Sequence, residues 1–332
     1  MNELIRKLVE AYGPSGFEDG VRELIRAEIA PYFNEIRVDA MGNLIAHRPP
    51  DADGPGLKVL VAAHTDEIGV MVTHVTEKGF LRFTNIGGVF PHNLSGSRVQ
   101  FADGTIGVIY WERLDDHTKV HPLSKHYIDV GATSRQDCPI GVGSAAGFTR
   151  SFVAQGRRLT AKSMDDRIGC VVMIEALKRL TSSPHDLYFV FSVQEEVGTR
   201  GAEVVANALT PDVGIAVDIT PTGDMPEAPT LAVGLGQGTA IKVKDSGMIA
   251  HAGLVRLMRQ RAEEAGIPYQ MEVLERGSTD ARSMQIAGPG CAAGCISVPC
   301  RYAHSTSETV DSEDVEASIR LLVEMVSRPI QL

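Results

Sequence analysis

The chain has 332 residues, of which 43% are hydrophobic and 22% charged, a composition that excludes an intrinsically disordered protein. A net charge of −10 argues against a surface that binds nucleic acid or an anionic membrane. The sequence lacks an apolar run long enough to cross a membrane and lacks the apolar stretch of a signal peptide. Together with an odd number of cysteines, these features predict reduced thiols in a cytoplasmic protein.

The chain opens with two segments of helical periodicity, residues 2–12 and 18–30. Between them, Ser15 and Glu18 have the S-x-x-E spacing of a capping box, which predicts the start of the second helix. Two short strands around a turn are expected within 38–45. The run at 57–63 is continuously apolar, which is typical of a strand buried on both faces, and it ends at His64.

The sequence pattern is different between about residue 69 and residue 155. Short alternating segments recur there, separated by Gly, Pro, Asn and Asp, and the region carries no amphipathic helical pattern. Such a pattern predicts a small all-β barrel or sandwich.

After about residue 160, strands again alternate with helices. The expected strands are 187–193, 213–217, 230–234, 239–244, 269–273 and 292–298, and the expected helices are 165–180, 200–208, 249–265, a short one after Thr279, and 312–327. This rhythm predicts an α/β fold with a mixed, mostly parallel sheet flanked by helices. We therefore expect one α/β domain formed by residues 1–68 and 156–332, interrupted by an inserted β-barrel domain of residues 69–155.

The strand expected at 187–193 ends in two adjacent carboxylates, Glu195 and Glu196. Charged side chains are rarely buried unless they are paired or bound to metal. Two acids at the end of a core strand therefore need a cation, a shared proton or open solvent. A solvated loop is the alternative to a functional site at this point.

Metal-capable side chains follow a strand or start a helix at four further places. They are His64 with Asp66, Asp165 with Asp166, Asp218, and His304. Because sites in open α/β sheets form at the carboxyl ends of strands, we expect one edge of the sheet to gather them. Taken singly, each has a simpler explanation, such as a helix cap for the paired aspartates.

Two histidines and several carboxylates, with no cysteine among them, form a ligand set that suits Zn²⁺, Co²⁺ or Mn²⁺. One shared carboxylate with two more ligands per ion would hold two ions about 3.5–4 Å apart, as in cocatalytic hydrolases.

The segments that carry these residues resemble the tetrahedral, dodecameric metallo-aminopeptidases, a family that includes glutamyl and deblocking aminopeptidases and proteins once labelled cellulase M. The match covers nearly the whole chain in order. The matching segments are GPSGFE (13–18), AHTDEIG (63–69), AKSMDDR (161–167), VQEEVGTRGA (193–202), VDIT (217–220), STDA (278–281) and RYAHS (301–305). One departure follows His304, where Ser305-Thr306 replaces the more usual Ser-Pro, which bears on specificity more than on chemistry.

The resemblance implies a ligand set for two divalent ions. His64, Asp165 and Asp218 would hold one ion. Asp165, Glu196 and His304 would hold the other, with Asp165 bridging. Zn or Co are the expected metals, with Mn as a further candidate.

The resemblance also implies roles for two residues that are not ligands. Asp66 would accept a hydrogen bond from the His64 ring and fix its tautomer. Glu195 would act as the general acid and base. Adjacent residues in extended backbone point in opposite directions, so Glu195 and Glu196 need a bend to serve one site, and Gly198 indicates one.

The activity implied is a metal-dependent aminopeptidase that removes N-terminal residues from short peptides with water activated by two metals. A deacylase or other amidohydrolase with the same dinuclear core is the alternative. A glycosidase is a different class, since it usually needs two carboxylates beside a sugar and no metal pair. The resemblance further implies a homododecamer built from dimers through the inserted domain. The net charge and the lack of a long apolar run predict no nucleic-acid or membrane partner.

Overall fold

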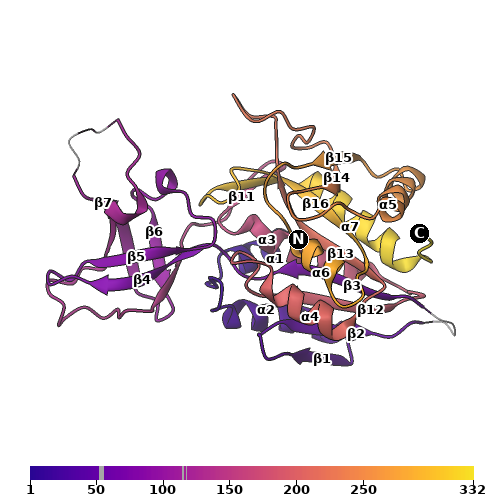
Figure 1. Cartoon of the computed structure of the whole chain (residues 1–332), viewed down its shortest axis with the longest axis horizontal. Coiled ribbons are helices and arrows are strands. Elements are labelled where there is room, and N and C mark those ends of the chain that lie inside the picture. Colours follow the sequence, from indigo (N-terminus) through magenta and orange to yellow (C-terminus); the bar gives the residue numbers. More distant parts are fainter. Residues whose placement is uncertain (52–55, 114–115, 117) are drawn as a thin grey trace.

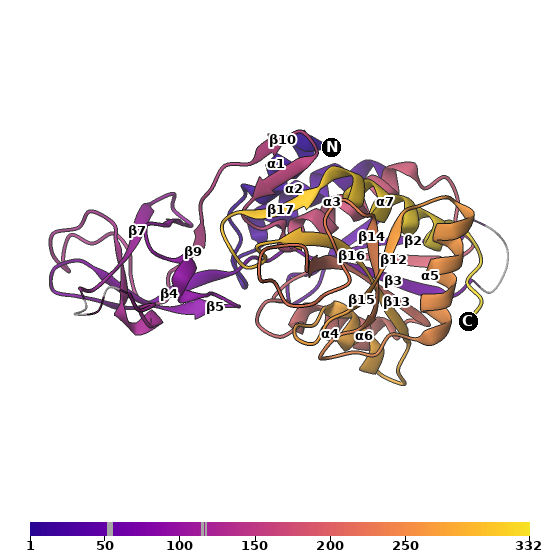
Figure 2. The ribbon, with the colours of Figure 1, turned by 90° about the horizontal axis from the view of Figure 1, so that it is seen from above.

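A computed structural model of the whole chain describes residues 1–51, 56–113, 116 and 118–332. The chain forms a larger α/β body and a smaller β body that extends to one side (Figure 1). Both termini lie on the larger body (Figure 2). No helix among the described residues is long and apolar enough to cross a membrane.

The larger body is built on a mixed sheet of 11 strands whose centre is parallel. Four adjacent strands form that centre: β12 (Asp186–Ser192), β3 (Lys58–His64), β13 (Val213–Pro221) and β16 (Ala292–Arg301). They are almost wholly buried, because their continuous apolar runs are covered on both faces.

Antiparallel strands extend this centre on both sides. Beyond β12 lie β2 (Leu44–Arg48) and β1 (Glu35–Val38), and beyond β16 lie β17 (Glu308–Asp311), β11 (Arg158–Ala161) and β10 (Val153–Gln155). A branch from β16 carries β14 (Thr239–Lys244) and β15 (Tyr269–Val273).

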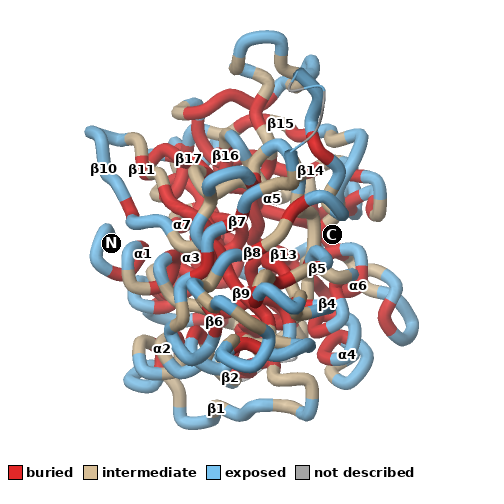
Figure 3. Tube along the Cα trace, turned by 90° about the vertical axis from the view of Figure 1, so that its left-hand side faces the viewer, coloured by how far each residue is buried: buried red, intermediate tan, exposed pale blue. Residues whose placement is uncertain are grey.

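Helices cover both faces of the sheet (Figure 2). One face packs against α1 (Asn2–Val9), α2 (Asp19–Ile29), α3 (Met164–Arg179), α5 (Ala252–Glu264) and α7 (Ser312–Ser327). The other face packs against α4 (Arg200–Leu209) and α6 (Asp280–Ile286). Each face has its own apolar core, and buried residues gather around the central strands (Figure 3).

The smaller body is a closed antiparallel barrel with its own apolar core. Its strands close in the order β4 (Gly69–Val75), β5 (Leu81–Ile86), β8 (His126–Asp129), β7 (Ile106–Trp111), β6 (Arg98–Phe101) and β9 (Ala145–Phe148). Short 3₁₀ turns are η1 (Ala30–Tyr32) in the larger body, and η2 (Pro91–Asn93) and η3 (Leu123–Lys125) in the loops of the barrel. The predicted fold class, a helix-flanked mixed sheet with an inserted β-barrel, is confirmed.

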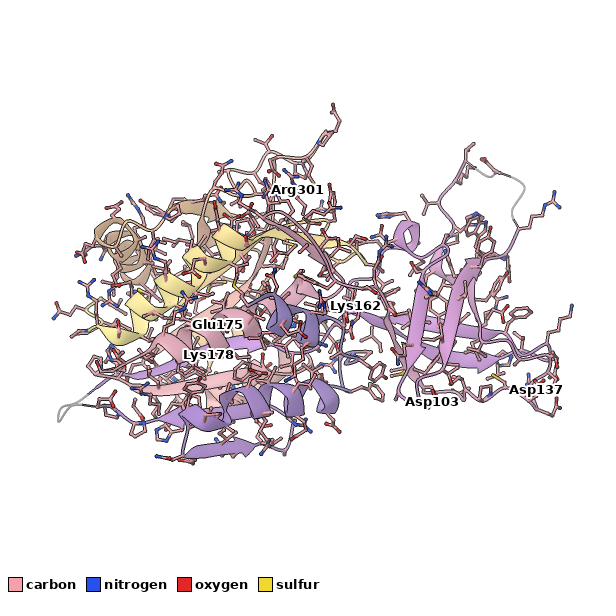
Figure 4. All side chains as sticks on the ribbon, turned by 180° about the vertical axis from the view of Figure 1, so that it is seen from behind. Asp103, Asp137, Lys162, Glu175, Lys178 and Arg301 are labelled. Carbon is pink, nitrogen blue, oxygen red and sulfur yellow. The ribbon has the colours of Figure 1, made fainter. Side chains whose placement is uncertain are left out.

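A buried ion network anchors the chain where it leaves β3 for the barrel. The Lys162 ammonium lies 2.6 Å from Glu67 Oε2, and Glu67 Oε1 accepts a hydrogen bond from the Gly13 amide at 3.0 Å. Arg167 is 0% exposed and donates to the carbonyl of Leu8 at 2.7 Å. Lys162 lies where the two bodies meet (Figure 4). Removing one partner of a buried ion pair is strongly destabilising, so this network holds α1, α3 and the segment after β3 in one arrangement.

The capping box predicted at Ser15 and Glu18 is wrong. The Ser15 hydroxyl donates to Asp66 at 2.6 Å, and the Glu18 carboxylate accepts from the Gly16 amide at 2.7 Å. The hydroxyl is drawn away from the helix because a buried carboxylate is the stronger acceptor. The segment is therefore tied to the end of β3 rather than to the start of α2.

Two strand predictions in the second half also need correction. Residues 230–234 form no strand; they follow Pro229 in a loop, where the Val233 carbonyl accepts from the Gly223 amide at 2.9 Å. The strand expected to end at residue 217 continues to Pro221, because it pairs with β16 along its whole length. Asp218 therefore lies within β13 and not after it.

Candidate metal centre

The predicted site residues converge at the carboxyl ends of the central strands. Six of them line a cavity of about 880 Å³, and Asp66 lies outside this lining. His64 is the last residue of β3, Asp218 lies near the end of β13, and Asp165 lies at the start of α3. Of the other three predicted residues in the lining, Glu195 and Glu196 follow β12, and His304 follows β16.

Asp165 lies between the two histidines. Its Oδ1 is 3.0 Å from Nε2 of His64, and its Oδ2 is 3.3 Å from Nε2 of His304. Glu196 Oε2 lies 3.7 Å from the same His304 nitrogen, whereas Glu195 Oε2 lies 4.0 Å from Nε2 of His64. The Asp165 carboxylate thus faces both histidines, and each histidine lies beside a different glutamate.

Asp66 sets the orientation of the His64 ring. His64 Nδ1 lies 3.4 Å from Asp66 Oδ1 and 3.2 Å from the Asp66 backbone carbonyl. A proton on Nδ1 would satisfy these acceptors and leave Nε2 available to bind a metal on the side of Asp165. This is the tautomer that a metal ligand at Nε2 requires.

Asp66 also shapes the loop that carries the two glutamates. Its carboxylate accepts hydrogen bonds from the amides of Glu195 at 3.0 Å and Glu196 at 3.1 Å. The predicted bend is present: Gln194 has a φ of 56° and Gly198 a φ of 119°. Because the backbone turns here, both glutamates reach the same cavity.

The adjacent aspartates have different surroundings. Asp166 is 0% exposed, and its oxygens accept hydrogen bonds from the amides of His64 at 3.2 Å and Gly169 at 3.1 Å. Asp165 directs its oxygens toward the histidines, and the peptide bond between the two aspartates is cis. Ligand atoms of His64, Asp166 and Asp218 lie within 4.8 Å of one another, as do those of His64, Asp165 and Glu196. The two backbone amides already engage Asp166, which leaves Asp165 as the freer carboxylate.

The barrel reaches into the site at His304. The carbonyl of Gly88, in the loop after β5, lies 3.0 Å from His304 Nδ1. Asn93 donates to the His304 carbonyl at 3.3 Å, and the ring of Phe90 lies 6.1 Å from the imidazole. His304 Nε2 is thereby directed at Asp165, so the smaller body takes part in building the site.

The cavity concentrates negative charge. Burial raises the pKa values of Glu195 and Asp218 well above those of ordinary carboxyls and raises the pKa of Glu196 to about 7. No lysine or arginine in the described part of the chain forms an ion pair with these three carboxylates or with Asp165. Lys242 lines the cavity, but its ion pair is with Glu272. Buried carboxylates without a lysine or arginine partner, grouped with two oriented imidazoles, fit divalent cations.

Comparison with known proteins identifies the family of the chain. The M42 glutamyl aminopeptidase family matches residues 42–321. The chain belongs to this family. A protein of Acetivibrio thermocellus is 44% identical over 98% of both sequences. Membership of the M42 family makes this protein a peptide hydrolase.

Two solved structures are similar throughout. The aminopeptidase APDkam598 from the archaeon Desulfurococcus kamchatkensis is 37% identical, with a TM-score of 0.94 over 99% of this chain and 94% of that one. PhTET1-12s, solved with a dodecamer in the asymmetric unit, is 33% identical, with a TM-score of 0.89 over 99% of both chains.

Gly88 and Lys242 are among the cavity-lining residues of this M42 chain that the sequence did not predict. Gly88 acts through a backbone carbonyl, which leaves no signal in a sequence. Lys242 and Glu272 did leave one: they are directly opposite each other on β14 and β15, where alternation directs both inward. A lysine and a glutamate at inward positions of neighbouring strands indicate a buried ion pair.

We expect Gly88→Ala to weaken ion binding at His304. An added Cβ would lie 2.2 Å from His304 Nδ1, so the ring must move away from Asp165. An orienting partner of a metal-bound histidine is typically worth about 10–100-fold in metal affinity. Metal content after dialysis against buffered free Zn²⁺ measures the loss.

Gly141→Ala is the matched control for that substitution. Gly141 is also a loop glycine of the barrel, and its Cβ would meet nothing within 4 Å. We expect it to bind ions as the wild type does. Equal metal content in both variants would show that contact with the barrel does not position His304.

Proposed function

We propose that this protein is a metal-dependent aminopeptidase that removes N-terminal residues from short peptides, with two divalent ions and Glu195 as the general base. The observation that carries the proposal is Asp165, whose two oxygens face the two histidines at 3.0 Å and 3.3 Å. Membership of the M42 family supports the same reaction class.

The proposed ligand set divides at Asp165. His64, Asp165 and Asp218 would hold one ion, and Asp165, Glu196 and His304 would hold the other; all five line the cavity. Zn²⁺ and Co²⁺ suit these nitrogen and oxygen donors best, and Mn²⁺ is also compatible with them. Ions held there supply Lewis acidity, which activates water and polarises a carbonyl.

Glu195 is not among the proposed ligands, so its carboxylate is free to transfer protons. It lines the cavity beside His64, while its backbone amide is held by Asp66. Its carboxylate would take a proton from the attacking water and pass it to the leaving amine.

Restriction to the first residue would come from how the site binds the N-terminus. A free N-terminal amine would bind beside one of the ions or a nearby acid of the cavity. A blocked amine would lose that contact. We therefore assign the protein to exopeptidases acting from the N-terminus.

The two bodies divide the work in this proposal. Residues 1–68 and 156–332 would form the catalytic domain, and residues 69–155 an assembly domain through which dimers build a homododecamer. The dodecamer of PhTET1-12s supports this assembly. Light scattering of the eluted protein tests it, and a monomer would contradict it.

The reaction is tested with a panel of aminoacyl-p-nitroanilides and their N-acetylated twins. The protein is stripped with a chelator and reloaded with Zn²⁺, Co²⁺ or Mn²⁺ in turn. Hydrolysis of unblocked substrates that requires the metal supports the proposal. Preference for the N-acetylated twins would favour a deacylase on the same core, and activity that survives chelation would exclude a metal mechanism.

A further inference from the structure

We infer that Glu308 is a positioning residue that holds Asp165 and His304 together and so sets the affinity of one of the two ion sites. This inference rests on the ligand set proposed above. Glu308 is the first residue of β17 and is 2% exposed. It lies outside the cavity lining and reaches the ligands through their backbones.

The Glu308 carboxylate joins two elements that are remote in sequence. Its Oε2 accepts a hydrogen bond from the Asp165 amide at 3.0 Å, and its Oε1 accepts one from the His304 amide at 2.8 Å. Asp165 starts α3, whereas His304 lies in the loop between β16 and β17. Bonds to a carboxylate are among the stronger neutral-donor hydrogen bonds, and here one group makes both.

The backbone at His304 needs such support. His304 has a φ of 60° and Tyr302 a φ of 61°, in the left-handed region that side chains other than Gly rarely adopt. Conformations of this kind persist where surrounding contacts hold them. Glu308 holds the His304 amide and Asn93 holds its carbonyl, so the position of the imidazole depends on both.

The other half of the centre has separate supports. His64 is oriented by Asp66, and the Asp218 carboxylate accepts from the Ile219 amide at 2.7 Å. Loss of Glu308 should therefore disturb the ion held by Glu196 and His304 more than the ion held by His64 and Asp218.

The test is Glu308→Gln, in which one oxygen that accepts from a backbone amide becomes an NH₂ group facing that donor. The stripped protein is titrated with Co²⁺ and Zn²⁺ by calorimetry, and bound metal is counted after desalting at buffered free metal. We expect the dissociation constant of the ion held by Glu196 and His304 to rise about 10–100-fold and that of the other ion to change less. Glu308→Asp keeps the charge with a shorter reach; it should fold and give a smaller rise.

Asp314→Asn is the matched control. Like Glu308, Asp314 is a buried carboxylate that accepts from two backbone amides, those of Gly236 at 2.6 Å and Gly238 at 2.7 Å. These residues lie outside the cavity lining. We expect this variant to lower the urea midpoint as Glu308→Gln does and to bind both ions like the wild type.

Three results would overturn the inference while leaving the proposed function intact: wild-type binding of both ions by Glu308→Gln, equal weakening of both, or the same loss in Asp314→Asn. If the glutamine variant does not fold, wild-type ion binding by Glu308→Asp would overturn it. A wild-type protein that binds no divalent ion would overturn the proposed function and this inference together.

Discussion

Replacing Glu195 with glutamine is expected to lower kcat by about 10²–10⁴-fold while both ions stay bound. Glutamine has nearly the same shape, so the cavity keeps its form, but its amide cannot take a proton from water. Glu195 Oε2 lies 4.0 Å from His64 Nε2, close enough to serve an attacking water beside the ions. The measurement is kcat on an unblocked aminoacyl-p-nitroanilide together with metal content.

Glu196→Gln is the internal control, because the two side chains share a loop and a cavity. Glu196 lies 3.7 Å from His304 Nε2 and is proposed as a ligand, so its variant should lose ion affinity first and activity as a consequence. Excess metal should therefore restore activity to Glu196→Gln and not to Glu195→Gln. Full activity in Glu195→Gln would refute its role as the base.

Asp165→Asn is expected to abolish binding of both ions and, with it, activity. The two oxygens of Asp165 face the two halves of the centre, and no other carboxylate among the described residues lies between the histidines in this way. Asparagine offers one oxygen and no charge, so it cannot bridge. Calorimetric titration of the stripped variant with Zn²⁺ measures the loss.

The Asp166→Asn variant tests whether Asp165 or its neighbour Asp166 is the metal ligand. The Asp166 oxygens accept from two backbone amides, so this variant should cost about 1–3 kcal/mol of unfolding free energy and still bind both ions. Urea unfolding and metal content report the two effects separately. The opposite pattern, with ion loss in Asp166→Asn and retention in Asp165→Asn, would reverse the assignment of the ligand.

Much of the fold is predictable because its signals are local. The continuous apolar runs of β3, β12 and β16 mark strands buried on both faces, and the short alternating segments between Gly69 and Phe148 mark the barrel. The site follows from the same pattern, since polar side chains that end parallel strands meet at one edge of the sheet.

The features that the sequence does not predict depend on backbone hydrogen bonds or on competition between hydrogen-bond acceptors. Gly88 and Glu308 place His304 by hydrogen bonds that depend on chain segments meeting in space. The Ser15 hydroxyl satisfies the rule for a helix cap, yet the buried Asp66 carboxylate takes it. Asp66 was expected to orient His64, but its hold on the amides of Glu195 and Glu196 follows only from the folded loop.

The most direct test of the two-ion site is to follow release of the first residue of an unblocked tripeptide while metal is returned stepwise to the stripped protein. We expect no hydrolysis without metal, and activity that rises as the second ion binds and levels off at two ions per chain. The same peptide with an acetylated N-terminus should stay intact. Full activity with no bound ion, or a plateau reached with one, would contradict a two-ion aminopeptidase centre built on Asp165.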